Sequence, residues 1–316
     1  KGTNLDITRI KGFKVFRKFR KAFLVNEYLK NNDIKGVFFD HWKSLEHIKS
    51  EYLNKIPNFC LIHSKEINHP VGSSLNSRMN KALKKTRFIV SNSRYTKNLA
   101  ISMGLETNKI HIINPGTNYP VAIEEKNAEE AKEIFGSSFP KIITVSRLDR
   151  RKNHQNILMT IKNLIPTYPD IKYICVGDGD EKNNLRDLST QLELDRYVVF
   201  IPSANEKLKI ALLNEANLFL MPSIVYKKSV EGFGISFIEA GSYGKGSIGG
   251  IAGGEADAIE NGRTGYLCDG NDLTSIYETI LKFFQNDNYK VLGLQAKDFS
   301  KKFKWENIIK KYLSLI

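Results

Sequence analysis

Short apolar runs of strand type alternate with stretches of helical periodicity along most of this chain. A strand that pairs in parallel with the next one needs a crossover connection, usually a helix, so this alternation predicts βαβ units and an α/β fold with doubly wound parallel sheets. The expected strands are 36–40, 59–63, 87–91, 110–114, 141–146, 172–176, 198–201, 218–222, 245–249 and 266–268. The expected helices are 42–54, 74–85, 94–103, 153–165, 181–193, 206–215, 235–243, 272–286 and 305–316.

Two domains are expected from the length of 316 residues and from a break after Pro115-Gly116. The break continues as an acidic, flexible stretch to about Lys126 and is interpreted as a linker. The predicted domains are residues 1–116, with its first strands expected to be missing, and 117–295. Residues 296–316 are expected to form a C-terminal helical segment that returns to the first domain.

The chain has neither a secretory signal pattern nor an apolar run of the ~20 residues that span a bilayer. Its three cysteines, Cys60, Cys175 and Cys268, lie in apolar strand-like runs and are interpreted as reduced core residues. These features predict a cytoplasmic protein.

Positive charge is concentrated in the first third of the chain. Residues 1–116 contain 22 Lys and Arg against 8 Asp and Glu, whereas the remainder contains 26 of each. Such a field attracts an anionic partner, which could be nucleic acid, an acidic membrane surface or a phosphorylated substrate.

Residues 11–30 are predicted to form an amphipathic helix. Phenylalanines 16, 19 and 23 gather with Val15 on one side, and Lys14, Arg17, Lys18 and Lys21 gather on the other. The helix could pack its aromatic stripe on a sheet, or it could lie on anionic lipid, where basic and aromatic residues reinforce each other. The second interpretation predicts a protein bound peripherally to the inner face of a membrane.

The stretch from Glu231 to Glu239 places two carboxylates eight positions apart across a turn with two glycines. Gly232 and Gly234 leave no side chain above the turn, and the helix expected from Ile235 directs its free N–H groups there, which suits a diphosphate. The carboxylates would then accept hydrogen bonds from ribose and sugar hydroxyls. The alternative is a buried helix with a glycine cap and two surface glutamates.

Basic residues follow the first strand of the second domain. Ligands of open parallel sheets bind beyond the carboxyl ends of the strands, so Arg147 and Lys152 are expected at the same crevice. A guanidinium fork and an ammonium group together neutralise a diphosphate. Taken alone, two basic residues five positions apart are usually ordinary solvated residues.

An ordered set of motifs in this chain resembles the retaining GT-B glycosyltransferases of family 4. The motifs are Ser146-Arg147-Leu148 with Lys152, Val176-Gly177-Asp178-Gly179, Leu220-Met221-Pro222-Ser223, Glu231-Gly232-Phe233-Gly234 with Glu239, Gly253-Gly254-Glu255 and Asn261-Gly262-Arg263-Thr264-Gly265-Tyr266. The resemblance implies a GT-B fold, with two Rossmann-like domains facing a cleft. It also implies an EC 2.4 hexosyltransferase that uses a UDP-, GDP- or ADP-sugar, acts on a carbohydrate or lipid-linked acceptor and serves cell-surface polysaccharide or glycolipid synthesis.

The same resemblance implies roles for individual residues. Arg147 and Lys152 would clamp the diphosphate and stabilise the leaving group, Glu239 would bind the ribose, and Glu231 would contact the donor sugar. His63 matches a histidine that faces the donor sugar in this family, although a strand-end histidine is more often structural. The donor would also be bound by Gly177, Asp178 and the backbone N–H groups of Gly232, Phe233 and Gly234.

The mechanism implied by the resemblance is front-face attack by the acceptor hydroxyl with retention of configuration. No metal and no other cofactor is expected, because the two cations already neutralise the departing diphosphate. Asp178-Gly179-Asp180 superficially matches the Asp-x-Asp metal motif of the other glycosyltransferase fold, but it also matches the Gly-Asp-Gly turn of family 4.

Three other classes of protein are alternatives to a glycosyltransferase. A nucleotide-sugar epimerase shares the architecture without needing this Arg, Lys and double-Glu set. An NAD enzyme is disfavoured because Gly177-Asp178-Gly179 lacks the third glycine of the dinucleotide fingerprint. A nucleic-acid-binding protein would explain the charge, but no basic and aromatic motif of a known reader is present, so no nucleic-acid partner is expected.

Overall fold

A computed structural model describes residues 6–316 of the chain, except for the side chains of Lys14 and Val15. The chain divides into two compact units, each with its own parallel sheet. The N-terminal unit contains the described residues up to Asn92 together with Thr96–Ile112 and Leu315–Ile316. The C-terminal unit contains Ser93–Tyr95 and Ile113–Ser314.

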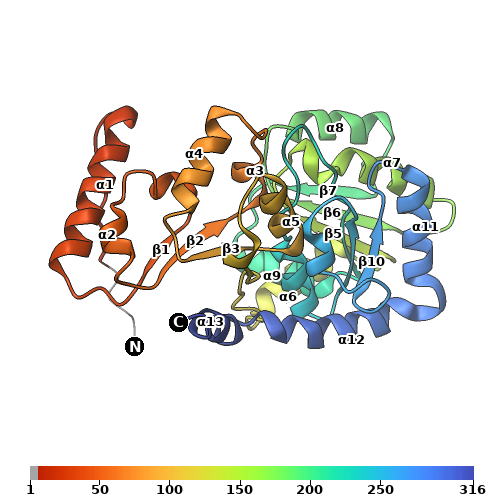
Figure 1. Cartoon of the computed structure of the whole chain (residues 1–316). Helices are drawn as coiled ribbons and strands as arrows, with labels where there is room; N and C mark the ends of the chain where they lie inside the picture. The colour runs from red at the N-terminus through yellow and green to blue at the C-terminus, as the bar shows by residue number, and fades with distance from the viewer. Residues whose placement is uncertain (1–5) are drawn as a thin grey trace. The chain divides into compact units, whose positions relative to one another are not determined.

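The N-terminal unit is built on a four-stranded parallel sheet in the order β1-β2-β3-β4 (Figure 1). Its core includes Trp42, Met79 and Ile89, which are buried between this sheet and the helices connected to it. Its elements are α1 (Lys14–Asn31), β1 (Val37–Phe39), η1 (Trp42–Ser44), α2 (Ser50–Leu53), β2 (Asn58–Ile62), α3 (Ser64–Ile67), α4 (Ser74–Leu83), β3 (Phe88–Ser91), α5 (Arg94–Ser102), η2 (Thr107–Lys109) and β4 (Ile110–Ile112).

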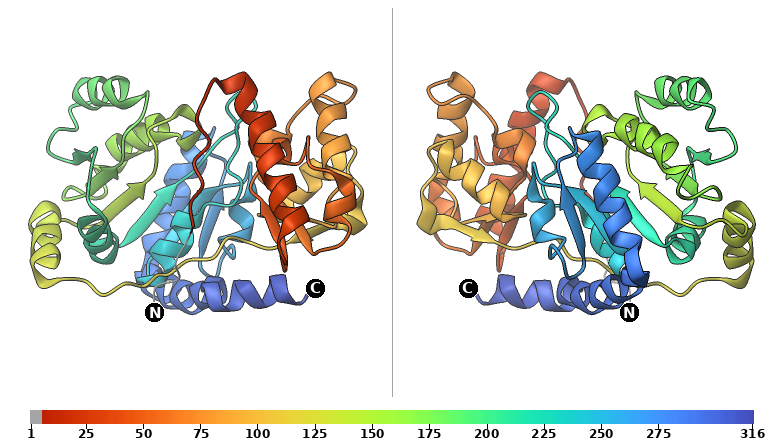
Figure 2. Two further views of the ribbon diagram at one scale, coloured as in Figure 1. Left: turned by 90° about the vertical axis from the view of Figure 1, so that its left-hand side faces the viewer. Right: turned by 90° about the vertical axis from the view of Figure 1, so that its right-hand side faces the viewer.

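The C-terminal unit is built on a six-stranded parallel sheet in the order β10-β9-β8-β5-β6-β7. Helices cover both faces of this sheet, so each face carries its own apolar cluster (Figure 2). The elements up to the reversal of strand order are α6 (Glu125–Phe135), β5 (Lys141–Val145), η3 (Arg150–Lys152), α7 (His154–Leu164), β6 (Lys172–Val176), α8 (Lys182–Gln191), β7 (Val198–Ile201) and α9 (Glu206–Glu215). The remaining elements are β8 (Leu218–Met221), α10 (Ile235–Ser242), β9 (Gly246–Gly250), η4 (Gly254–Asp257), β10 (Gly265–Cys268), α11 (Leu273–Phe284), η5 (Gln285–Asp287), α12 (Asn288–Ser300), η6 (Lys301–Phe303) and α13 (Trp305–Leu313).

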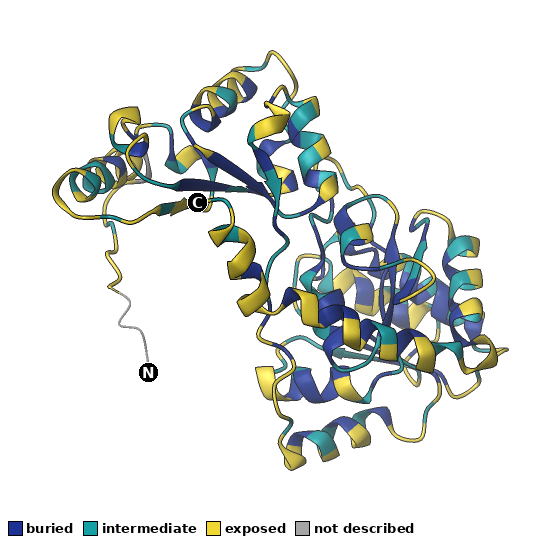
Figure 3. Cartoon of the chain, turned by 60° about the horizontal axis from the view of Figure 1, so that its bottom comes forward, coloured by how far each residue is buried: buried dark blue, intermediate teal, exposed yellow. Residues whose placement is uncertain are grey.

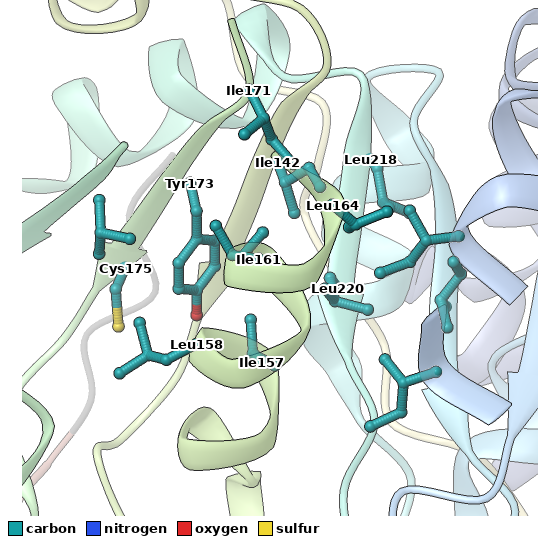
Figure 4. Packing of buried hydrophobic residues seen from close by; sticks show 14 of the residues in the cluster. Ile142, Ile157, Leu158, Ile161, Leu164, Ile171, Tyr173, Cys175, Leu218 and Leu220 are labelled. Carbon is teal, nitrogen blue, oxygen red and sulfur yellow. The ribbon is translucent and has the colours of Figure 1, made fainter. Parts of the chain in front are cut away.

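Helix α7 illustrates how sequence periodicity becomes packing. Its apolar residues recur at the helical spacing, so one stripe faces the sheet and is buried. The strands beneath it are apolar on both faces, as expected when helices cover a parallel sheet on both sides. Figure 4 shows the contact, with Ile157, Leu158, Ile161 and Leu164 of α7 against Ile142, Tyr173, Cys175, Leu218 and Leu220 of the sheet.

Every strand predicted from the sequence is present, with bounds shifted by at most two residues at either end. The prediction of one helix over residues 42–54 is wrong, because the chain forms the short 3₁₀ turn η1 and the single helical turn α2 there. Trp42, Leu45 and Ile48 are all buried at a spacing of three residues, which suits a 3₁₀-like segment better than an α-helix.

Two helices of the C-terminal unit were not predicted. Helix α6 begins at Glu125, where a flexible linker was expected to end, and it buries Ala131 and Phe135 from an otherwise charged sequence. Helix α12 occupies Asn288–Ser300, across the predicted boundary at residue 295. The three cysteines are buried and free, as predicted.

The amphipathic helix predicted at 11–30 is observed as α1, but its packing differs from the first interpretation. Ala22 is buried and Val25 and Leu29 pack against the core, whereas Phe16 and Phe23 are 67% and 65% exposed. The stripe that faces the core of the unit is therefore aliphatic, and the phenylalanines lie outside it. Figure 3, coloured by burial, shows that most helices carry exposed residues along one side, whereas most strand residues are buried. None of the described helices combines the length and the apolar character needed to cross a bilayer.

Glycine at position 177 is required by both conformation and space. Its φ is +135°, and a Cβ built there would lie 1.9 Å from the carbonyl oxygen of Ser146. We expect Gly177→Ala to lower the free energy of unfolding by about 3 kcal/mol or more, because the backbone of the 146 loop must move. Urea denaturation followed by circular dichroism measures the change.

Gly262→Ala is the matched control. Gly262 has a φ of +79° but no atom within 4 Å of an added Cβ, so only the backbone conformation is penalised, by about 1 kcal/mol. Equal losses for the two variants would contradict the close approach of the two loops at Gly177.

Candidate functional site

The order of the strands in the C-terminal unit reverses between β5 and β8. At such a switch point the loops that leave the two carboxyl ends diverge to opposite faces of the sheet and leave a crevice, which is where open α/β sheets bind ligands. The loop after β5 contains Arg147 and Lys152, and the loop after β8 contains Glu231. The backbone of the two loops is joined, because the N–H of Ile224 donates to the carbonyl oxygen of Arg151 at 2.9 Å.

Three charged side chains meet at this point. Arg151 Nη1 lies 2.6 Å from Glu231 Oε2, and Lys152 Nζ donates to the same oxygen. All three side chains are largely buried, with exposed fractions of 16%, 11% and 13% for Arg151, Lys152 and Glu231. Burial opposes the ionisation of Glu231, but Lys152 and Arg151 outweigh it and hold the pKa of Glu231 below its usual value.

The structure thus brings together Lys152 and Glu231, two of the residues predicted to bind the donor, and adds Arg151. Sequence reasoning missed Arg151 although it lies in the run Arg150-Arg151-Lys152. Arg150 turns away and pairs with Glu181. The signal was therefore visible in the sequence, but the side chain that turns inward could not be chosen from spacing alone.

Arg147 lies two residues after the end of β5, close to its predicted place, and its side chain is exposed. Within residues 6–316 its guanidinium forms no ion pair, so it differs from Lys152 and Arg151 in the same loop. Its predicted contact with a diphosphate stays a prediction.

Gly177 and Asp178 follow β6 and lie against the loop that carries Arg147. Besides Gly177, Gly179 is also closely packed, since a Cβ there would lie 2.4 Å from the carbonyl oxygen of Leu148. The N–H of Leu148 donates to the carbonyl oxygen of Asp178 at 3.0 Å. The Asp178 carboxylate accepts from the Gly179 N–H and pairs with Lys182, and these contacts lower its pKa. The two glycines are thus explained by packing, while donor binding by Gly177 and Asp178 stays a prediction.

The turn from Glu231 to Gly234 leads into α10. Gly234 caps the helix with a φ of +86°, and a Cβ there would lie 2.5 Å from the ring of Phe237. Gly254 holds the turn from the other side, because its N–H donates to the carbonyl oxygen of Glu231 at 2.8 Å. The Phe233 side chain is buried, so the groups that Gly232, Phe233 and Gly234 can offer a donor are their backbone N–H groups.

Glu239, in α10, belongs to a second ionic group. It lies 3.9 Å from Lys209 of α9, and Lys209 in turn lies 2.9 Å from Glu206. Burial raises the pKa of Glu239, Lys209 opposes this effect and Glu206 adds to it. Lys209 was not predicted, and nothing in its sequence context distinguishes it from other surface lysines of a helix.

His63 lies at the carboxyl end of β2 in the N-terminal unit, where it was predicted. Its backbone N–H donates to the carboxylate of Glu66. Its ring Nδ1 lies 3.4 Å from Nδ2 of Asn92, which follows β3. His41 follows β1, and its pKa is lowered by burial, by Lys43 and by His63. Polar residues therefore gather at the carboxyl ends of three strands of this unit, and a contact between His63 and a sugar stays a prediction.

No group of three or more His, Cys, Asp or Glu side chains in the described part of the chain is arranged to hold a metal ion. The Asp178 carboxylate of the Asp-Gly-Asp sequence is instead paired with Lys182.

Comparison with known proteins places this site in a family. The family model "Glycosyl transferases group 1" matches residues 125–301, which is more than half of the chain. The region contains every residue of the two ionic groups described above.

Among curated proteins, a GDP-mannose-dependent monoacylated alpha-(1-6)-phosphatidylinositol monomannoside mannosyltransferase of Corynebacterium glutamicum is 28% identical over 53% of this chain and 44% of its own length. N-acetyl-alpha-D-glucosaminyl L-malate synthase of Bacillus anthracis is 24% identical over 60% of this chain and 48% of its own length. The chain thus spans about half the length of these relatives.

Among solved structures, Anabaena HepE in complex with UDP and glucose has a TM-score of 0.76 at 18% identity, covering 95% of this chain and 82% of its own. A glycosyltransferase of Rickettsia africae has a TM-score of 0.79 at 19% identity, covering 98% and 83%. The two parallel-sheet α/β units and these neighbours confirm the predicted GT-B fold.

The buried carboxylate of Glu231 predicts a pH-dependent loss of stability. Because its folded pKa is depressed, its contribution is present above the unfolded value of 4.5 and disappears as pH falls through the folded pKa. At pH 7 Glu231→Gln should lower the free energy of unfolding by about 3 kcal/mol, since Lys152 loses its counter-ion and Arg151 keeps only the more distant Asp149. At pH 3.5 the difference from wild type should be smaller in urea denaturation.

Glu260→Gln is the control, because Glu260 pairs with Arg263 and Lys302 at a more exposed site. Its loss should not exceed about 1 kcal/mol. A similar cost for the two variants at pH 7 would contradict the buried ionic group.

Proposed function

Since the chain belongs to the Glycosyl transferases group 1 family, we propose that it is a retaining hexosyltransferase that moves a sugar from a nucleoside diphosphate to an acceptor hydroxyl. The observation that carries the proposal is the group of cations at the switch point of the C-terminal sheet. Arg151 and Lys152 pair there with Glu231, Arg151 also lies 3.9 Å from Asp149, and Arg147 in the same loop is a third cation. The site therefore retains positive charge for an anionic ligand.

The diphosphate is the group that this charge suits. Arg147, Arg151 and Lys152 leave the end of β5, while the turn at Gly234 directs the first N–H groups of α10 towards an anion. As the bond between the anomeric carbon and the phosphate oxygen breaks, negative charge collects on the diphosphate, and these groups stabilise it. This is the reason to propose that the reaction proceeds without a metal ion.

The pairing of Glu231 bears on the stereochemical outcome. A carboxylate already held by Lys152 and Arg151 is a poor nucleophile, so it supports sugar binding better than a covalent glycosyl-enzyme. In the proposed step the acceptor oxygen attacks on the face from which the diphosphate departs. The new bond forms from the acceptor oxygen to the anomeric carbon, and the hydroxyl proton passes to the departing phosphate oxygen.

The names of the relatives suggest the kind of donor and acceptor. One relative is named as GDP-mannose-dependent, and the neighbour HepE is described in complex with UDP. We propose a UDP-, GDP- or ADP-sugar donor, with Glu239 on the ribose, and an acceptor in glycolipid or cell-surface polysaccharide synthesis.

Helix α1 supports a membrane-bound acceptor. Its side chains include exposed phenylalanines and several cations, among them Arg17 and Lys18, in the third of the chain that holds all of the excess positive charge. Exposed aromatic rings insert at the interface of a bilayer while the basic residues meet anionic headgroups. We propose that this unit binds the inner leaflet peripherally.

Calorimetric titration with UDP, GDP and ADP in EDTA tests the donor site. We expect one nucleotide to bind, and Glu239→Ala to weaken its binding by about 1–3 kcal/mol, because a charged hydrogen-bond partner of the ribose is lost. Glu215→Ala is the control, since Glu215 is at the far end of α9 and pairs with Lys141 at the start of β5. Failure of all three nucleotides to bind, with and without added magnesium, would refute the proposed donor site.

Co-sedimentation with vesicles tests the membrane part. At low salt the protein should bind phosphatidylglycerol vesicles but not phosphatidylcholine vesicles, and Phe16→Ala with Phe23→Ala should weaken this binding by about tenfold or more. Leu294→Ala, an equally exposed apolar residue on α12, is the control. A folded protein that ignores anionic vesicles would contradict the membrane assignment.

A further inference from the structure

Glu255 is a buried acid that the donor site described above does not use. It lies in η4, in the Gly253-Gly254-Glu255 motif, with an exposed fraction of 0%. Its Oε1 lies 3.4 Å from the backbone N of Ser223, in the loop after β8. Its Oε2 and the Ser223 hydroxyl oxygen have no hydrogen-bond partner within the described residues.

The space around the carboxyl group is formed by glycine backbone. A Cβ on Gly250 would lie 2.9 Å from Glu255 Oε2, and one on Gly249 would lie 3.5 Å from the Glu255 Cβ. Neither neighbour brings a charged side chain, and no ion pair of Glu255 occurs among residues 6–316. The site therefore admits a carboxyl group without supplying a counter-ion.

The charged and titratable groups that face Glu255 come from each surrounding element. Glu231 comes from the loop after β8, Lys152 from η3 and Cys268 from β10, with the backbone of Gly250 and Ser223 completing the surroundings. Burial, and after it the repulsion of Glu231, raise the pKa of Glu255 to about 8, although contacts with Ser223 and Gly250 and the attraction of Lys152 oppose this rise. Near neutral pH the protein therefore holds Glu255 in its protonated form.

We propose that Glu255 is a positioning residue that must keep its proton for the donor site to bind a nucleoside diphosphate. The proposal rests on the proposed function and deepens it. Arg151 and Lys152 share the carboxylate of Glu231, and Arg151 also lies 3.9 Å from Asp149, so an ionised Glu255 would be a third carboxylate beside these two cations. It would also compete with the diphosphate for the Lys152 ammonium, because attraction is strong where water is excluded.

The test compares nucleotide affinity in wild type and Glu255→Gln from pH 7 to 9.5, with the nucleotide that wild type binds at pH 7. Wild type should lose about tenfold or more in affinity over this range as Glu255 ionises beside Glu231. Glu255→Gln keeps the shape and the neutral charge, so it should match wild type at pH 7 and bind nearly equally across the range. Glu215 is a partly buried glutamate that pairs with Lys141 at the amino end of β5, at the edge of the sheet opposite the donor site. Glu215→Gln should therefore follow the wild-type curve.

Two results would overturn the role of Glu255. One is a wild-type affinity that does not fall up to pH 9.5, which needs no variant to observe. The other is an alkaline loss in Glu255→Gln as large as that in wild type, which would assign the titration to a different group.

A measurement without nucleotide separates this inference from the proposed function. Since the folded pKa of Glu255 lies above the unfolded value of 4.5, its protonated form favours folding most below that value, and the contribution is lost as pH rises towards about 8. The urea midpoint of wild type should therefore fall relative to that of Glu255→Gln between pH 5 and 8. If this difference appears but no nucleotide binds either protein, the donor site is refuted while the protonation of Glu255 stands; parallel pH curves refute the protonation itself.

Discussion

A carboxylate that is removed from water needs cations beside it, and in this protein that requirement joins two loops far apart in the sequence. Glu231 follows β8, whereas Arg151 and Lys152 follow β5. Because β5 and β8 are neighbours at the reversal of strand order, their loops can meet only at this edge of the sheet. The ion pairs of Glu231 and the order of the strands thus both bring the two loops together at the switch point between β5 and β8. The same ion pairs hold the turn that leads from Glu231 into α10.

The acids near this place have different environments and therefore different charge states. Glu231 is stabilised as an anion by two cations, Glu239 has one more distant lysine, and Glu255 forms no ion pair with any described residue. The pKa values move apart accordingly, downward for the first and upward for the other two. A site for a highly charged donor benefits from this separation, since each additional buried anion would weaken the attraction for phosphate.

Regular packing was the part of the fold that could be predicted from the sequence. Helix α9 and strands β6 and β7 have the predicted bounds, because their apolar spacing matches a buried face. Helix α6 was not predicted, because it has few apolar residues among its charged ones. In the site, Lys152 and Glu231 were predicted as separate donor contacts, yet their mutual pairing depends on which side chains of the Arg150 to Lys152 turn face inward. The burial of Glu255 without an ion pair to any described residue is likewise a tertiary property that no local pattern encodes.

The close contacts of glycine backbone at this edge constrain how such a site can change during evolution. Side chains at Gly177, Gly179 and Gly254 would meet a carbonyl oxygen within 2.4 Å, so these positions cannot be varied to suit a new ligand. Variation is left to the segments that bear exposed side chains beside them, such as Val225 and Lys227 in the loop after β8. The glycine positions of the site are therefore fixed, whereas the exposed loop residues beside them can change. A change of substrate preference would be expected to arise from substitutions in this exposed loop.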